Sequence, residues 1–194
     1  ALEREGLSGL EFLDSVPGSV GGWLAMNAGA QGGEIGSHVS WIRCLNPDGK
    51  SLILTPDDCG FAYRRCAGLA GRVAVACGLR VSRAGALPVR TLREAARAKR
   101  IPLAGLRTEG SVFRNPAGDS AGRLLDAAGC KGMRIGGARV TDFHANIVAV
   151  DETVTASDVL ALVARMRDWV ERGCGVRLIP EISGLDDERT GLRI

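Results

Sequence analysis

Two short stretches carry side chains that could handle an anion and a proton. Tyr63, the only tyrosine, precedes two arginines, and Ser111 lies in 110–116 between a glycine and a later cation and amide. A serine hydroxyl beside cationic and amide groups could donate a proton to an anionic intermediate. Two adjacent arginines usually form a solvated edge, so the first stretch alone does not establish a site.

Two further stretches have a polar character. Residues 129–138 place Lys131 and Arg134 among glycines, which suits a diphosphate, although the G-x-x-G spacing is weak support. Glu181 follows Pro180; such a carboxylate is normally exposed, and it could hold a proton only if it lay in a buried cleft. A Ser-His-Asp hydrolase is disfavoured because the sequence lacks G-x-S-x-G and His144 is the only plausible partner.

The glycine loop, residues 16–33, is dense in glycine and carries no charge. Its bare N–H groups could hold a phosphate without any basic side chain. The alternative is a Gly/Ala-rich turn that packs closely against neighbouring backbone. Composition alone does not decide between these two interpretations.

Turn and cap signals in the first half of the sequence predict the helices and strands that position the glycine loop and Tyr63. Strand-like residues 39–45 and 50–54 flank a turn at 46–49, which predicts a hairpin. Thr55 followed by Pro56 predicts the start of a short helix. A valine-rich strand is predicted over 73–81, and a short helix or turn over 7–16 carries apolar residues into a core.

The second half of the sequence mixes helices and strands. A capping box at 91–94 predicts a helix that begins there and ends before Pro102. Ser120 is expected to cap another helix, and 145–150 read as a buried strand. The clearest helix begins at 155–158, with apolar residues on one face and arginines, among them Arg167, on the other.

Composition bounds the function class. The 194 residues carry a net charge of +3 in dispersed form, which argues against a nucleic-acid partner. No stretch is long and apolar enough for a membrane span, so no membrane association is expected. The scattered cysteines lack metal-ligand spacing, so we expect free thiols in a cytoplasmic protein and no metal.

Taken together and in order, these motifs resemble the UDP-N-acetylenolpyruvoylglucosamine reductases, the MurB flavoenzyme family of peptidoglycan synthesis. The resemblance covers nearly the whole sequence. It rests on residues 6–13, 17–22, 26–30, 63–64, 110–116, 118–124, 131–132, 134–138, 144–146 and 180–181. The short distance from Tyr63 to Ser111 resembles the compact form of the family.

The resemblance implies an α+β fold. We expect a partial FAD-binding, MurB/PCMH-like domain with an antiparallel sheet over 1–90, and a smaller α+β substrate-binding domain over 91–180. A tail over 181–194 would carry Glu181. The family's N-terminal FAD-binding segment, a Gly-Ser-Asn loop, is expected to lie before Ala1, so that the chain is the later part of a longer protein.

The resemblance also implies an oxidoreductase. NADPH would reduce FAD, and the enolpyruvyl double bond of UDP-N-acetylglucosamine enolpyruvate would be reduced to give UDP-N-acetylmuramate. Ser111 would donate the proton, while Arg64 and Glu181 would stabilise the enol-like intermediate. A cytoplasmic monomer that serves cell wall biogenesis, cell shape and cell division is expected.

Further site residues are implied by the same resemblance. The expected FAD contacts are Pro17, Gly18, Ser19, Val20, Gly21, Gly22, Asn27 and Ala28. The expected substrate contacts are Tyr63, Arg114, Asn115, Lys131, His144 and Asn146.

The sequence also departs from the family pattern. Cys66 replaces the Ser or Asp that is usual after Tyr-Arg-x, and 100–109 lack a Thr-Gln-Pro piece. A truncated or degenerate relative that binds a UDP-sugar or nucleotide without catalysis is the main alternative, and another flavin oxidoreductase is a third hypothesis.

Overall fold

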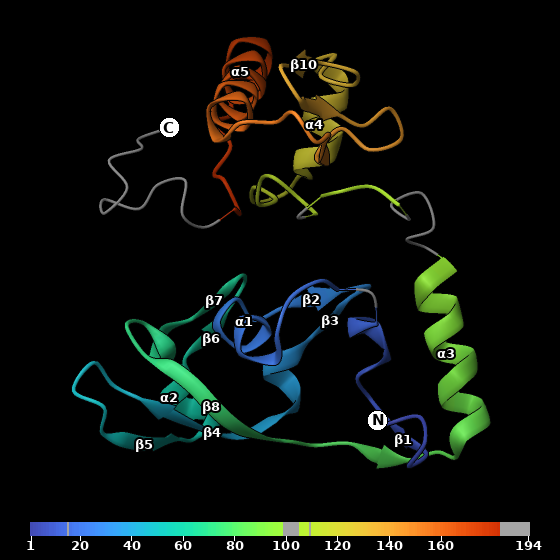
Figure 1. The fold of residues 1–194 in the computed structure, drawn as a ribbon, viewed down its shortest axis with the longest axis vertical. Helices are drawn as coiled ribbons and strands as arrows, with labels where there is room; N and C mark the ends of the chain where they lie inside the picture. Colours follow the sequence, from blue (N-terminus) through green and yellow to red (C-terminus); the bar gives the residue numbers. More distant parts are fainter. Residues whose placement is uncertain (15, 99–104, 109, 183–194) are drawn as a thin grey trace. The chain divides into compact units, whose positions relative to one another are not determined.

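The computed structural model describes residues 1–14, 16–98, 105–108 and 110–182. Backbone contacts divide the chain into two units, Ala1–Ile101 and Pro102–Ile194, whose helices and strands are drawn in Figure 1. Each unit has its own buried apolar core. Both units combine helices with antiparallel strands, which confirms the predicted α+β class.

The first unit is built from short strands and helical turns around one sheet. Its elements are β1 (Leu7–Ser8), η1 (Glu11–Leu13), α1 (Val20–Ala25), β2 (Gly29–Ala30), β3 (Gly33–Glu34), η2 (Ile35–His38), β4 (Val39–Leu45), β5 (Ser51–Leu54), α2 (Pro56–Cys59), β6 (Phe61–Ala62), β7 (Arg65–Cys66), η3 (Ala67–Leu69), β8 (Val73–Leu79), β9 (Ser82–Arg83) and α3 (Ala86–Ala98).

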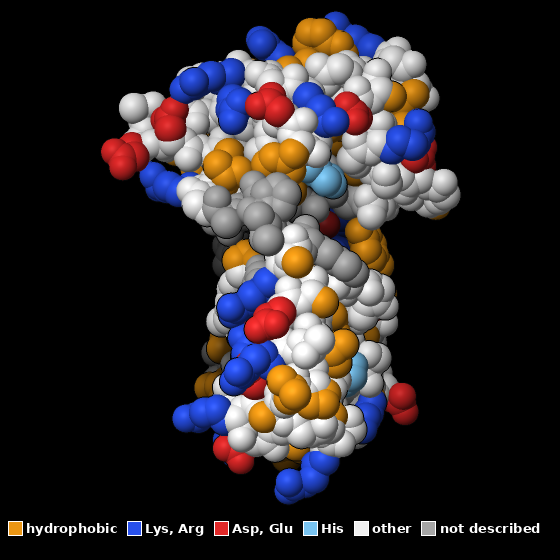
Figure 2. Space-filling view, turned by 90° about the vertical axis from the view of Figure 1, so that its right-hand side faces the viewer, with side chains coloured by type: hydrophobic (Ala, Val, Ile, Leu, Met, Phe, Trp, Pro, Cys, Tyr) orange, Lys and Arg blue, Asp and Glu red, His pale blue; other side chains and the backbone are white. Residues whose placement is uncertain are grey.

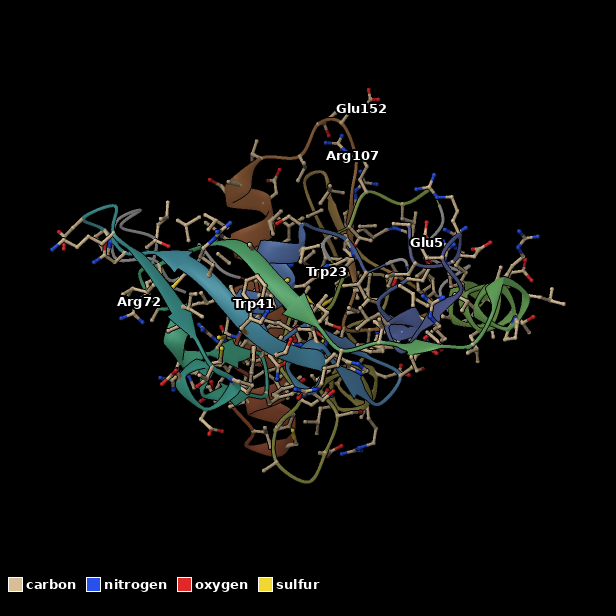
Figure 3. All side chains as sticks on the ribbon, turned by 90° about the horizontal axis from the view of Figure 1, so that it is seen from below. Glu5, Trp23, Trp41, Arg72, Arg107 and Glu152 are labelled. Atoms are coloured by element: carbon tan, nitrogen blue, oxygen red, sulfur yellow. The ribbon has the colours of Figure 1, made fainter. Side chains whose placement is uncertain are left out.

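The central sheet has the strand order β5-β4-β8, with both pairs antiparallel. In β4, Val39, Ile42 and Cys44 are fully buried in the core, and a shift in register between Val39 and Trp41 interrupts the alternation of buried and exposed residues. Trp41 lies on the other face of the same strand and is 40% exposed (Figure 3). The predicted hairpin and the predicted strand over 73–81 are therefore confirmed, because β4, β5 and β8 form this sheet.

The predicted start of the short helix α2 is also confirmed. The Thr55 hydroxyl accepts a hydrogen bond from the Asp58 amide, and the Asp58 carboxylate accepts one from the Thr55 amide. Gly60 ends the helix with φ of +52°, a left-handed conformation that glycine adopts without a steric cost.

The predicted start of α3 at Thr91 is wrong, because the helix begins at Ala86. Thr91 lies inside the helix, where its hydroxyl donates to the carbonyl of Leu87 (3.2 Å). Three arginines spaced along one side of α3 form ion pairs with Glu3 and Asp14 of the N-terminal segment; they are Arg90, Arg93 and Arg97. These contacts hold α3 in the first unit, so the boundary falls later than residue 90, where we expected it.

The second unit packs one long helix and one short helix with a small sheet. Its elements are α4 (Ala121–Ala127), β10 (Arg134–Ile135), β11 (Ala138–Val140), β12 (Val148–Val150) and α5 (Ala156–Cys174). The antiparallel strand order is β10-β11-β12. Figure 3 labels Arg107, which pairs with Val150 of β12, and Glu152 in the turn that follows this strand.

The helix caps of the second unit follow the prediction. Ser120 accepts from the Arg123 amide at the start of α4, and Thr155 forms a capping box with Asp158 at the start of α5. Two details differ. The strand predicted over 145–150 covers only Val148–Val150, and Arg167 is 9% exposed although it was expected on the polar face.

Three general properties of the described residues complete the fold. All the cysteines are free thiols, as predicted. Among the residues that the structure describes, no helix has the length and apolar character needed to cross a membrane. Basic and acidic side chains are interspersed on the face drawn in Figure 2.

The ion pairs of α3 generate a prediction on pH. Hydrogen bonding by Arg90 lowers the pKa of Glu3. Such a carboxylate stabilises the fold above its unfolded-state pKa, near 4.5, and this stabilisation is lost as the pH falls through the lower folded-state pKa. We expect Glu3→Gln to lower the free energy of unfolding at about pH 6 and to have little effect at about pH 3.

Urea unfolding of both proteins at both pH values measures this difference. Glu5→Gln is the matched control, since no ion pair joins Glu5 to another described residue. Glu5 is labelled in Figure 3. An effect of Glu3→Gln that is equal at the two pH values would contradict the assigned interaction.

Candidate functional site

The glycine loop contains a helix that we did not predict. Ser19 begins α1, because its hydroxyl accepts a hydrogen bond from the Gly22 amide (3.1 Å). The first main-chain bond of the helix runs from the Trp23 amide to the Ser19 carbonyl (2.9 Å). The amides of Val20 and Gly21 precede that bond, so they are the first, unpaired N–H groups that a helix start leaves for other acceptors.

The later glycines of the loop are needed for close packing. A Cβ atom at Gly29 would lie 2.6 Å from the Gly33 carbonyl oxygen, and one at Gly33 would lie 2.9 Å from the ring of Phe12. A Cβ atom at Gly36, just beyond the loop, would lie 2.7 Å from Asn27 Oδ1. The close-packing interpretation therefore holds for this part of the chain.

Close packing does not explain the earlier glycines Gly21 and Gly22. A Cβ atom at Gly21 would come no closer than 3.8 Å to a neighbouring atom, and one at Gly22 no closer than 3.5 Å. Both distances are ordinary van der Waals contacts. The exposed residues Pro17, Gly18 and Ser19 precede them. This part of the loop presents bare backbone, as a loop that binds phosphate requires.

Asn27 lies inside the first unit and does not face outwards. It is 2% exposed and adopts φ of +44°, a conformation that asparagine tolerates better than most residues. Its Oδ1 accepts from the Gly36 amide (2.9 Å), and its Nδ2 donates to the Glu34 carboxylate (2.9 Å) and to the Ala62 carbonyl (3.0 Å). The predicted cofactor contact is therefore not available to this side chain, whose two N–H groups are both used; Ala28 is also buried.

The β6–β7 hairpin presents Tyr63 and Arg64 as its two turn residues. Arg64 has φ of +54°, and its guanidinium lies 4.8 Å from the Tyr63 ring centre. Its Nη2 also donates to the carbonyl of Gly29 in the glycine loop (3.3 Å). Asn27 binds the carbonyl of the residue before this turn, so the loop and the hairpin form one connected structure.

Cys66, at a position where the sequence departs from the family pattern, is a core residue. Its thiol is buried and donates to the carbonyl of Cys59 (3.3 Å). Burial raises the pKa of the Cys59 thiol to about 12. These thiols are therefore packing groups beneath the hairpin and poor nucleophiles.

In the second unit, Ser111 and Glu181 lie on neighbouring extended segments. Phe113 pairs with Pro180 in an antiparallel bridge. The Glu181 amide donates to the Val112 carbonyl (2.7 Å), and the Arg114 amide donates to the Ile179 carbonyl (2.9 Å). Proline is tolerated here because the ladder bonds come from its two neighbours, so its missing N–H is not needed.

A polar cavity of about 310 Å³ adjoins Ser111. It gathers predicted residues from separate segments, namely Ser111, Asn115, Lys131, His144 and Asn146. Asn115 accepts from the Ala121 amide (3.0 Å) through its Oδ1, and His144 Nδ1 accepts from the Asn146 amide (3.2 Å). The bond to Nδ1 assigns the proton of a neutral His144 ring to Nε2.

The cavity also contains charged residues that we did not predict. Asp126 forms an ion pair with Lys131 (2.7 Å), and Arg123 binds Asp119. The hydrogen bond from Arg123 lowers the pKa of Asp119 to about 2. Because α4 places Arg123 and Asp126 one turn apart, helix periodicity from the Ser120 cap was the signal that could have found them.

A larger cleft, of about 740 Å³, lies in the first unit. Mainly apolar side chains line it, among them Leu10, Val16, Val20, Trp23 and Val89. Val20 and Trp23 belong to α1, so the cleft adjoins the bare part of the glycine loop. The sequence indicated the segment 7–16, with Leu10, as core and Val20 as an FAD contact, and it gave no sign of a cleft.

Comparison with known families gives two matches to separate parts of the chain. The family described as UDP-N-acetylenolpyruvoylglucosamine reductase, C-terminal domain, matches residues 102–185. The family described as FAD binding domain matches residues 1–55. The two matches follow the order of the two units.

Individual relatives carry the same name. The UDP-N-acetylenolpyruvoylglucosamine reductase of Alkalilimnicola ehrlichii is 41% identical over 181 residues, which cover 92% of this chain and 61% of the relative. UDP-N-acetylenolpyruvoylglucosamine reductase 2 of Symbiobacterium thermophilum is 43% identical over 182 residues, which cover 92% of this chain and 59% of the relative. The chain thus spans about three fifths of the length of these curated relatives.

A solved structure supports the same assignment. The crystal structure of UDP-N-acetylenolpyruvylglucosamine reductase (MurB) from Thermus caldophilus superposes with a TM-score of 0.82 at 32% identity, over 93% of this chain and 65% of that one. The resemblance inferred from the ordered motifs is thereby confirmed. Sequence relatives, domain matches and fold agree that the chain belongs to the UDP-N-acetylenolpyruvoylglucosamine reductase family.

Proposed function

We propose that this chain carries out the NADPH-dependent, FAD-mediated reduction of UDP-N-acetylglucosamine enolpyruvate to UDP-N-acetylmuramate. The observation that carries the proposal is the hydrogen bond from the Glu181 amide to the Val112 carbonyl, which holds Glu181 next to the segment of Ser111. The reaction needs a proton donor and a group that stabilises developing negative charge, and these two residues have the required chemistry.

The first unit has features that fit FAD. The amides of Val20 and Gly21 at the start of α1, with the uncrowded Gly21 and Gly22 around them, suit the pyrophosphate. The adjoining apolar cleft suits an aromatic ring system. When bound, FAD supplies the hydride for the substrate after it has been reduced by NADPH.

Ser111 donates the proton in this proposal. Addition of hydride to one carbon of the enolpyruvyl double bond leaves the electron pair on the carbon next to the carboxylate, and the Ser111 hydroxyl protonates that carbon. The side chain is exposed to the polar cavity, which also contains Lys131. A cation near the hydroxyl stabilises the alkoxide that the transfer leaves behind.

Arg64 and Glu181 stabilise the enol-like intermediate. Hydride addition moves negative charge onto the substrate carboxylate, where the Arg64 guanidinium can donate hydrogen bonds, and Glu181 lies on the segment that neighbours Ser111. The contact with Gly29 and the stacking on Tyr63 restrict the Arg64 guanidinium. Tyr63, Arg114, Asn115, Lys131 and His144 remain the proposed substrate contacts.

The proposed activity belongs to peptidoglycan synthesis. In that role the protein acts as a cytoplasmic monomer and contributes to cell wall biogenesis, cell shape and cell division. The relatives' names support the reaction, and the location, the monomeric state and the cellular roles are further parts of the proposal.

A visible spectrum tests the proposal most directly. The purified protein is incubated with FAD, and NADPH and then the enolpyruvyl UDP-sugar are added under anaerobic conditions. We expect flavin absorbance that is bleached by NADPH and restored by the sugar. A colourless protein that binds the UDP-sugar without turnover would instead favour the non-catalytic alternative.

Substitution of the proton donor should separate the two half-reactions. We expect Ser111→Ala to lower the rate of sugar reduction by about 100-fold or more, because the general acid is removed. We expect Glu181→Gln to lower it as well, while NADPH bleaches the flavin at the normal rate in both variants. Stopped-flow absorbance measures each half-reaction, and Ser51→Ala on exposed β5 is the control. Equal loss of both half-reactions would contradict the assigned roles.

Two glycine substitutions should separate cofactor binding from packing. Gly21→Ala has room for its Cβ atom, so we expect a nearly unchanged melting temperature and an FAD affinity lowered about tenfold or more. Gly36→Ala would crowd Asn27 and Phe61, so we expect a loss of about 1–3 kcal/mol in unfolding free energy. Thermal melts and FAD titration measure both quantities. Unchanged FAD affinity in Gly21→Ala would contradict the placement of the cofactor.

A further inference from the structure

The main chain of Phe113 needs a hydrogen-bonding partner on the side away from Pro180. In the antiparallel bridge between Phe113 and Pro180, the ladder bonds are made by Val112 and Arg114 on one segment and by their partners on the other. The amide and the carbonyl of Phe113 therefore point to the opposite side. Phe113 is 1% exposed, so water does not satisfy these groups.

The side chain of Asn146 supplies that partner. Its Oδ1 accepts from the Phe113 amide (2.9 Å), and its Nδ2 donates to the Phe113 carbonyl (2.8 Å). The carbonyl of Asn146 also accepts from the Val112 amide (2.9 Å). The carboxamide thus binds Phe113 through one donor and one acceptor, as a residue of a neighbouring strand would.

Asn146 is itself fixed. It is 3% exposed and lies between the buried residues Ala145 and Ile147. Its main-chain amide donates to His144 Nδ1 (3.2 Å), and the following residue, Ile147, forms an antiparallel bridge with Ser111. The fixed side chain of Asn146 therefore binds Phe113, two residues after Ser111. It does so on the side of this segment that faces away from Glu181.

We infer that Asn146 is a positioning residue, which fixes the Ser111 hydroxyl for proton transfer by clamping the main chain of Phe113. The inference rests on the proposed role of Ser111 as proton donor. It replaces our expectation that Asn146 contacts the substrate, because the carboxamide is buried and bonded to main chain even though the residue borders the polar cavity. A displacement of about 1 Å in a reacting group can cost about 100-fold in rate.

The substitution that tests the clamp is Asn146→Asp. The carboxylate has the same shape and still accepts from the Phe113 amide, but it cannot donate to the Phe113 carbonyl and repels that oxygen. We expect kcat for sugar reduction to fall between about 10-fold and 100-fold, with KM changed less than about threefold. The solvent deuterium isotope effect on kcat should rise, since proton transfer becomes slower, and flavin reduction by NADPH should not change.

A double variant shows whether Asn146 acts through Ser111. Added to Ser111→Ala, the Asn146→Asp substitution should cause little further loss, because the group that it positions is already absent. Asn46→Asp is the matched control in an exposed turn, where the Oδ1 of Asn46 accepts from the Lys50 amide (2.8 Å) and a carboxylate can do the same. A raised KM with unchanged kcat in Asn146→Asp would overturn the inference. So would a kcat of the double variant that is reduced by the product of the two single-variant factors.

Hydrogen exchange keeps the inference testable without turnover. We expect the Phe113 and Val112 amides to exchange faster in Asn146→Asp, and in the milder Asn146→Ser if the first variant folds poorly, while the amide of Leu162 in the core keeps its protection. Unchanged exchange at both amides would refute the clamp. If exchange rises as expected but the unsubstituted protein reduces no sugar, the proposed reaction fails and the clamp stands.

Discussion

Buried main-chain groups in very short strands need partners that a wider sheet would supply, and in each unit a buried asparagine supplies them. Asn27 binds the Gly36 amide and the Ala62 carbonyl in the first unit, and Asn146 binds both main-chain groups of Phe113 in the second. In each case the bound segment leads directly to a residue of the proposed chemistry, Arg64 or Ser111. The precision of the site therefore depends on side-chain amides as much as on regular secondary structure.

The glycine loop combines two demands that composition could not separate. Its early part starts a helix and leaves backbone uncovered, and its later part lets three segments come within contact distance. Both parts need glycine, but for different reasons. A side chain at Gly29 or Gly33 would force neighbouring atoms to shift, whereas one at Gly21 or Gly22 meets only ordinary contacts and would change chiefly what the loop can bind.

Local signals were sufficient for much of the fold. Helices begin at Thr55 and Thr155 as predicted, and each of these residues forms a capping box, whose groups all lie within a few residues. Thr91 shows the same pattern without the cap, since α3 already begins at Ala86 and its arginines bind the N-terminal segment. A local pattern cannot reveal contacts that join residues about eighty positions apart in the sequence.

The sequence motifs indicated residues of the candidate site but not the contacts that these residues make. The ordered motifs indicated Ser111, Lys131 and His144, and the structure gathers them at one cavity. The same motifs indicated Asn27 and Asn146 as ligand contacts, although both side chains are bonded to main chain from distant parts of the sequence. A sequence motif indicates that a residue type is needed at a position. It does not distinguish a side chain that contacts a ligand from one that holds the main chain in place.

The ion pair between Lys131 and Asp126 gives the polar cavity a property of its own. The bond to Asp126 engages one of the three N–H donors of the Lys131 ammonium, and both side chains of the pair are partly exposed. An anion can therefore bind Lys131 beside Asp126, but it meets a cation whose charge the carboxylate already offsets in part. The net attraction is weaker than that of an unpaired lysine, so a ligand group with more than one negative charge benefits more from this lysine than a singly charged or neutral group does.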